Sequence, residues 1–234
     1  MVEYRILSLD LSDVITEGKG ALFSNFIERY GDELARKILV KCFTSKGPLA
    51  SARNDMFRGK LSEADFFRRI ATAVNDERVK AEELQEIFSA TVRRPIKETM
   101  TLLKRIVGQK GKPRPMIFVV ADHVEEEKEG ILNIPGLREL VDGYIWSFDL
   151  HLCKKDKPPY TLWGKGFFDE MKRLLAVDTE CNEEHMDPKT IIYVDHLTEN
   201  VMAANKAGFT ARLFRGADGL ERWLKSLGFE FTPA

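Results

Sequence analysis

Cysteine is scarce in this chain: only Cys42, Cys153 and Cys181 occur among 234 residues. The three are widely spaced and odd in number, so they predict neither a disulfide framework nor a zinc cluster. Free thiols are typical of proteins in a reducing compartment, and we therefore expect the protein to be cytoplasmic.

Long hydrophobic runs and an excess of charge of one sign are also missing. No apolar stretch approaches the ~20 residues that a helix needs to cross a bilayer. Residues 1–13 carry acids where a signal peptide carries bases. The net charge of −1 gives no large attraction to polyanions. We therefore expect neither nucleic acid nor a membrane as a partner, and we expect a monomer or a homodimer.

The remaining composition is that of an ordinary globular protein, with 44% hydrophobic and 31% charged residues. The length suits one domain with a modest insertion. Short apolar runs alternate with segments of helical periodicity, which indicates a parallel sheet with right-handed crossovers. The runs that predict buried strands are 4–9, 116–120, 144–146, 191–194 and 211–214.

One long segment between the first predicted strand and Pro95 has only helical patterns. Apolar residues recur at helical spacing from Leu22 to Tyr30, and Ser62 with Asp65 forms a helix-start signature. This region therefore reads as a helical insertion into the α/β pattern. Farther along the chain, residues 131–141 predict a further short helix.

Two acidic residues follow apolar strands directly, Asp10 after the first and Asp195 after the fourth. In open parallel sheets, ligands bind in the crevice outside the carboxyl ends of the strands. Two carboxylates brought to that edge would suit a hard cation such as Mg²⁺. The alternative is a pair of solvated loop acids or helix caps.

The motif Asp10–Val14 after an apolar strand resembles the opening motif of the haloacid dehalogenase-like (HAD-like) hydrolases, Asp-x-Asp-x-Thr/Val. Asp195–Gly208 is similar to the last motif of that superfamily, and Phe57–Phe66 resembles cap helices of its sugar-phosphate phosphatase and epoxide hydrolase branch. The resemblance implies an α/β fold with a Rossmann-like three-layer parallel-sheet core. Residues 1–16 and 93–234 would form this core, and residues 17–92 a small all-helical cap.

The resemblance also implies a chemistry. In the family the first Asp attacks phosphorus and forms an aspartyl-phosphate, and Asp10 matches it. Mg²⁺ would be held by Asp10, the backbone carbonyl of Ser12 and Asp195. The family lysine, which balances charge, corresponds to Lys154 by counting without a gap, or to Lys157 by matching Lys-Pro. A small phosphorylated compound would be the substrate.

Three positions depart from the family pattern. Ser12 stands where the family has its general acid–base Asp, and a serine hydroxyl cannot do that proton chemistry near pH 7. Ala121 replaces the Ser or Thr whose hydroxyl holds the phosphate, although backbone N–H groups there would still bind an anion. Asp122 would place a negative charge beside that phosphate. His196 replaces the second Asp of the last motif.

Two neighbouring residues are expected to stay out of the site. Asp13 would point away from it, because adjacent side chains on an extended segment face opposite ways. His123 is expected at the surface. The retained acids favour a hydrolase of weakened activity, whereas the departures favour a catalytically inactive module that binds a ligand or a protein. Dehalogenase-type chemistry is a third alternative, which the retained Asp195 opposes.

Overall fold

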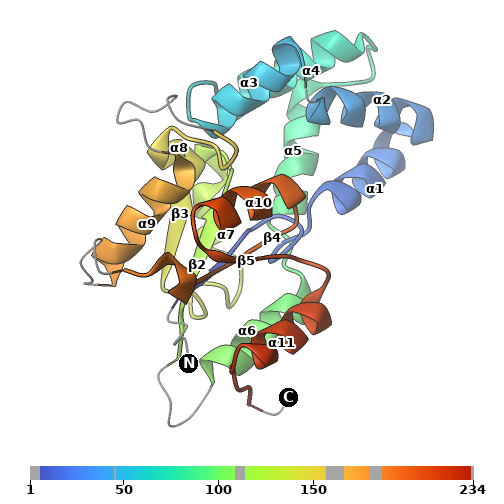
Figure 1. Cartoon of the computed structure of the whole chain (residues 1–234). Coiled ribbons are helices and arrows are strands. Elements are labelled where there is room, and N and C mark those ends of the chain that lie inside the picture. The colour runs from blue at the N-terminus through green and yellow to red at the C-terminus, as the bar shows by residue number, and fades with distance from the viewer. Residues whose placement is uncertain (1–5, 45, 109–113, 157–165, 180–185, 233–234) are drawn as a thin grey trace.

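The structure is a computed structural model that describes residues 6–44, 46–108, 114–156, 166–179 and 186–232. The described residues form one sheet of parallel strands in the order β3-β2-β1-β4-β5 (Figure 1). The strands are β1 (Ile6–Leu9), β2 (Met116–Ala121), β3 (Gly143–Trp146), β4 (Ile191–Asp195) and β5 (Thr210–Leu213). The predicted strands are thus confirmed, except that residues 4 and 5 lie outside the described part.

Helices cover both faces of the sheet, which makes three layers. On one face Leu7, Val119 and Val194 pack in one apolar cluster with α6 (Lys97–Val107) and α11 (Ala217–Ser226). On the other face the alternate side chains, such as Ile6 and Tyr193, pack in a second cluster with α9 (Phe167–Asp178) and α10 (Thr198–Lys206). Strands buried on both faces read as continuous apolar runs, which is why the sequence revealed them. The predicted three-layer α/β class is confirmed.

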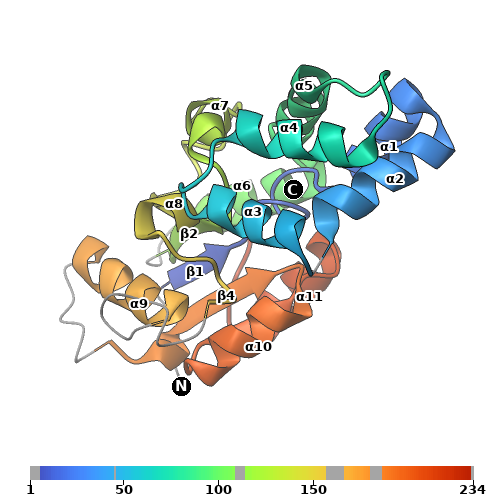
Figure 2. The same ribbon diagram turned by 90° about the horizontal axis from the view of Figure 1, so that it is seen from above.

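Among the described residues, five helices lie between β1 and α6 and form the insertion. They are α1 (Lys19–Tyr30), α2 (Asp32–Phe43), α3 (Pro48–Phe57), α4 (Glu63–Val74) and α5 (Ala81–Val92). Figure 1 shows them gathered on one side of the sheet, and Figure 2 looks down on α3 and α4. Their own apolar cluster includes Phe26, Ile38 and Ile70. The chain enters and leaves by adjacent segments, because the Glu17 N–H donates to the Arg94 carbonyl at 2.8 Å.

Some local predictions were wrong. The periodicity did not predict α3, whose buried face uses the small side chains Ala50 and Ala52. It also did not predict the short helix α8 (Ser147–Leu150). The helix predicted over 131–141 is instead a short helix, α7 (Lys128–Leu132), followed by turns. Pro135 and Gly136 interrupt that segment, and Gly136 has a φ of +77°.

The fold bears on the expectations of free thiols and of no membrane-spanning helix. Cys42 and Cys153 are buried free thiols, and burial raises the pKa of Cys42 to about 12. Cys181 lies outside the described residues. Within the described ranges, each helix is too short or too polar to span a bilayer.

Candidate functional site

The two strand-end acids lie at the same edge of the sheet. β1 and β4 are hydrogen-bonded neighbours, and the Asp10 N–H donates to the Val194 carbonyl at 2.8 Å. Asp10 is 5% exposed and Asp195 is fully buried. Side chains separated by 185 positions in the chain therefore face one small volume, and both carboxylates need compensating charge there.

Lys154 supplies that charge. Its Nζ lies 2.5 Å from Asp10 Oδ1 and 3.1 Å from Asp195 Oδ2. Burial opposes the charged form of this side chain, but the carboxylates of Asp10, Asp195 and Asp122 outweigh it and raise the pKa of Lys154 above its usual value. Of the two lysines that the sequence left open, Lys154 is thus the one at the acids, while Lys157 lies outside the described residues.

Asp195 is held on every side. Oδ2 accepts hydrogen bonds from the Tyr193 hydroxyl at 2.6 Å and from the Asn200 amide at 3.0 Å, and Oδ1 accepts from the Leu197 N–H at 2.8 Å. Burial alone would raise the pKa of Asp195, but the Lys154 ammonium and these donors lower it. The carboxylate is therefore ionised and fixed in orientation.

His196 contacts the nucleophile candidate from the other side. Its Nδ1 lies 2.7 Å from Asp10 Oδ2, and its Nε2 lies 3.8 Å from Asp13 Oδ2. Burial lowers the pKa of His196, but the hydrogen bond to Asp10 and the surrounding acids outweigh it, and the net shift is upward. Each oxygen of Asp10 thus faces one nitrogen, one from Lys154 and the other from His196.

Asp13 corrects one prediction. The segment after β1 is a turn, not an extended strand, and Asp13 has a φ of +58°. Its Oδ2 accepts from the Lys19 N–H at 3.1 Å, and a Cβ on Gly18 would collide with this carboxylate. The expectation that Asp13 points away was therefore wrong, because the turn directs it toward the pocket.

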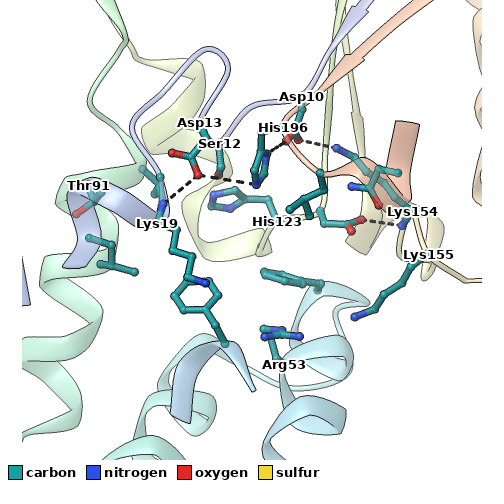
Figure 3. Close-up of a pocket in the computed structure, with 18 of the residues that line it drawn as sticks. Asp10, Ser12, Asp13, Lys19, Arg53, Thr91, His123, Lys154, Lys155 and His196 are labelled. Atoms are coloured by element: carbon teal, nitrogen blue, oxygen red, sulfur yellow. Dashed lines mark hydrogen bonds and ion pairs between the residues drawn. The ribbon is translucent and has the colours of Figure 1, made fainter. Parts of the chain in front are cut away.

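These side chains line a pocket of about 290 Å³ between the sheet edge and the insertion (Figure 3). Its size suits a small organic ligand. The core contributes polar groups, and the helices contribute mostly apolar ones. The lining from the helical insertion includes Lys19, Leu22, Phe43, Arg53, Phe57, Phe88, Thr91 and Val92.

The end of β2 differs from the expectation at two residues. Ala121 is buried in an apolar cluster and does not line the pocket. Asp122 does line it, and burial raises the pKa of Asp122 to about 6, while its Oδ1 accepts from the Lys154 N–H at 3.0 Å. His123 was expected at the surface, which was wrong: it is 1% exposed because the insertion covers it, and burial lowers its pKa to about 4.

A divalent cation would find donors at the sheet edge. Asp10, Asp195 and His196 each offer one ligand atom, and these atoms lie within 4.8 Å of one another. Two carboxylates fit Mg²⁺, and an imidazole in place of a second acid also admits a softer ion such as Zn²⁺. The residues present therefore fit a divalent cation. Ser12, whose carbonyl was the third predicted ligand, lines the same pocket.

Arg53 and His123 are among the pocket residues to which sequence reasoning gave no role. Arg53 lies on α3, a helix that the periodicity did not predict, so no local signal pointed to it. His123 was noticed only as a neighbour of Ala121 and Asp122. Its burial depends on Phe88 of α5, whose ring centroid is 5.9 Å from the imidazole centroid, and no local pattern encodes that contact.

Sequence comparison finds no match, neither among models of protein families nor among curated proteins. Comparison of folds does. A HAD family enzyme from Bacteroides thetaiotaomicron, solved with magnesium and inorganic phosphate, matches 91% of this chain and 94% of its own, with a TM-score of 0.57 and 13% identity. A protein described as a predicted HAD-like family hydrolase from Porphyromonas gingivalis matches 98% and 100%, with a TM-score of 0.63 and 14% identity.

A third similar structure is the L-2-haloacid dehalogenase from Xanthobacter autotrophicus. It matches 95% of this chain and 82% of its own, with a TM-score of 0.58 and 14% identity. At these identities the similarity concerns the fold. The chain has the fold of the HAD-like hydrolases, as the motifs in its sequence indicated.

Proposed function

We propose that the protein hydrolyses small phosphorylated compounds, with Asp10 as the nucleophile. The observation that carries this proposal is the carboxylate of Asp10, held between Lys154 and His196 at a pocket of ligand size. A nucleophile needs a fixed geometry and a partner that balances its charge, and this carboxylate has both. The solved complex of the Bacteroides enzyme with phosphate supports the same substrate class.

In the proposed reaction, one oxygen of Asp10 attacks the phosphorus of the ester and the bond to the leaving oxygen breaks. Water then attacks the aspartyl-phosphate, which releases inorganic phosphate and restores the carboxylate. The Lys154 ammonium offsets charge between the carboxylates and the phosphate. A divalent cation held by Asp10, Asp195 and His196 supplies, when bound, neutralisation of phosphate charge.

The leaving oxygen has no family acid to protonate it, because Ser12 holds that position. General acid–base catalysis is worth roughly 10²–10⁴-fold. The proposed activity is therefore slow for an ester whose leaving oxygen must be protonated, and faster for an ester whose leaving group needs no proton. A nitrophenyl phosphate is such a substrate, because its leaving group is stable as an anion.

A binding module without turnover is the second candidate function. Both oxygens of Asp10 are already engaged, by Lys154 and by His196, and the nearby carboxyl of Asp122 would repel a phosphate once ionised. These contacts favour a ligand that is held and not transformed. Dehalogenase-type chemistry at Asp10 shares the nucleophile but not the need for a cation.

The test is a screen of phosphate esters, including 4-nitrophenyl phosphate, with Mg²⁺, Mn²⁺ or Zn²⁺. We expect measurable turnover by the native protein and a loss of at least about 10³-fold in Asp10→Asn, as for removal of a covalent nucleophile. Asp218→Asn, at an exposed acid of α11, is the matched control and should keep full activity. Turnover that persists in Asp10→Asn would reject Asp10 as nucleophile.

If no ester is turned over, binding decides between the candidates. Beryllium fluoride with Mg²⁺ mimics a phosphoryl group on a carboxylate, and a ligand that binds only the folded state raises the melting temperature. A rise without turnover would favour the binding module.

Two buried free thiols, Cys42 and Cys153, fit a reducing compartment, and we propose the cytoplasm as the location.

A further inference from the structure

His123 is a buried imidazole, and one of its nitrogens has no partner within the part of the chain that the structure describes. The residue lies on the loop after β2 and is 1% exposed. The backbone N–H of Val124 donates to its Nδ1 at 2.9 Å. Its Nε2 has no hydrogen-bond partner among the described residues. Buried polar nitrogens are nearly always paired, so this one calls for an explanation.

The contact with Val124 fixes the position of the imidazole proton. A ring nitrogen that accepts a hydrogen bond cannot carry a proton, so in the neutral ring the proton sits on Nε2. Burial lowers the pKa of His123 to about 4, which keeps the ring neutral at neutral pH. Nε2 is therefore an N–H donor to which the described ranges offer no acceptor.

The residue that carries this donor lies at the pocket that contains Asp10 and Lys154. His123 lines that pocket, and Figure 3 shows its ring among the labelled side chains there. The aromatic ring of Phe88 does not accept a hydrogen bond from Nε2–H. An N–H group points at the face of an aromatic ring when the two rings are nearly perpendicular, whereas these rings are tilted by 36° at a centroid distance of 5.9 Å. An acceptor for Nε2–H would come from a ligand in the pocket.

The position of His123 in the fold suggests which ligand atom this is. β2 pairs with β1, so the loop after β2 lies beside the loop that follows Asp10. Ala121, at the end of β2, has no hydroxyl to offer a phosphate, and its methyl is buried in the core. His123 follows two residues later and supplies a donor from the same strand end.

We propose that Nε2–H of His123 donates a hydrogen bond to a phosphoryl oxygen of the ligand, in place of the hydroxyl that Ala121 lacks. The proposal rests on the proposed function for the phosphorylated nature of the ligand, but it requires no turnover. The cationic side chains of Lys19, Arg53 and Lys155 line the pocket and offer positive charge to a phosphoryl group, alongside the carboxylates of Asp10, Asp13, Asp122 and Glu199.

Two variants distinguish the loss of the hydrogen-bond donor from an effect on folding. His123→Asn keeps an oxygen that can accept from the Val124 N–H but is too short to donate into the pocket. His123→Gln keeps an N–H group at about the reach of Nε2. With inorganic phosphate and Mg²⁺ as the probe, we expect calorimetry to give a dissociation constant roughly tenfold or more above that of the native protein for His123→Asn. For His123→Gln we expect a change of less than about threefold.

A measurement on the native protein needs no variant. Long-range ¹H–¹⁵N spectra of the imidazole should show a neutral ring protonated at Nε2 at pH 7, and phosphate should shift that resonance. A proton on Nδ1, equal phosphate affinity in His123→Asn and the native protein, or no phosphate binding by the native protein would each overturn the proposal. Failure of the proposed hydrolysis has a different signature: phosphate binds and shifts the His123 resonance, but esters are not cleaved.

Discussion

Lys154 shows how much of the site depends on a single side chain. Its ammonium is 1% exposed and contacts two carboxylates, Asp10 and Asp195, while a third, Asp122, adds attraction. A buried charge is tolerated only when it is paired, and here one cation serves several anions. The acids at the sheet edge are thus compatible with a stable fold because this residue reaches them from the segment after α8.

Replacing Lys154 should therefore destabilise the protein strongly. Lys154→Met keeps the length of the side chain but leaves buried carboxylates unpaired, which costs about 3–5 kcal/mol. Denaturant unfolding at pH 7 measures the free energy of unfolding. Lys128→Met is the control, because Lys128 pairs with Asp149 at the surface, and such a pair is worth at most about 1 kcal/mol. Equal losses in the two variants would contradict the role given to Lys154.

At the scale of elements, buried acids join the insertion to the core. Glu63 is the first residue of α4 and is fully buried. Its N–H donates to Glu126 Oε1 at 3.0 Å, and its Oε2 accepts from Gln85 of α5. Burial, and next the charge of Glu127, raise the pKa of Glu63 to about 8. The folded protein therefore favours the neutral form of this carboxyl.

The stability of the protein should consequently fall as pH rises from about 4.5 to about 8. Glu63 holds its proton in the folded state over that range, whereas its ordinary pKa of 4.5 means that the unfolded chain releases it. Glu63→Gln removes the proton exchange and should be more stable than the native protein at pH 8, by roughly 1–3 kcal/mol, with the difference shrinking toward pH 5.

Denaturant unfolding at pH 5, 6.5 and 8 measures this difference. Glu28→Gln, at an exposed acid of α1, is the matched control and should follow the native profile. A Glu63→Gln profile parallel to that of the native protein would mean that Glu63 is ionised in the folded state.

The sequence predicted those helices and strands whose buried positions form a regular pattern of apolar residues. The central strands β1, β2 and β4 were found because they are buried on both faces, and Asp10 and Asp195 were found because they end two of these strands. The helix α3 was not found, because a face of alanines carries little periodic signal. The breaks at Pro135 and Gly136 were visible in the sequence, but the apolar residues around them outweighed them in the prediction.

The parts of the site that were not predicted depend on turns and on distant contacts. Asp13 reaches the pocket because of a positive φ angle and the room left by Gly18. His123 is buried because α5, from another part of the chain, covers it. The choice between two lysines needed the path of the segment after α8, which brings Lys154 to Asp10 across 144 positions. Local patterns carry none of this information.

At the scale of the whole molecule, the described residues of the insertion have an apolar cluster separate from those of the sheet, and the pocket lies between the insertion and the sheet edge. The cluster of the five-helix insertion draws one residue, Val124, from outside α1–α5 and their connections. The sheet has its own clusters on its two faces. The division into residues 17–92 and the remainder stays a prediction, and the separation of the clusters makes it testable through local stability.

Ile38 and Ile192 are matched probes of that division, since both are fully buried, one in α2 and the other in β4. Truncation of a buried isoleucine to alanine costs about 2–5 kcal/mol. If the insertion unfolds as a separate unit, Ile38→Ala should speed amide hydrogen exchange in α1–α5 and leave the strands protected. Ile192→Ala should instead speed exchange in the strands, because that residue stabilises the sheet on which the insertion rests. Equal acceleration throughout the chain in Ile38→Ala would mean that the insertion and the sheet unfold as one cooperative unit. In that case, Ile38→Ala would weaken phosphate binding because it destabilises the whole protein, and not because the insertion alone unfolds and opens one wall of the pocket.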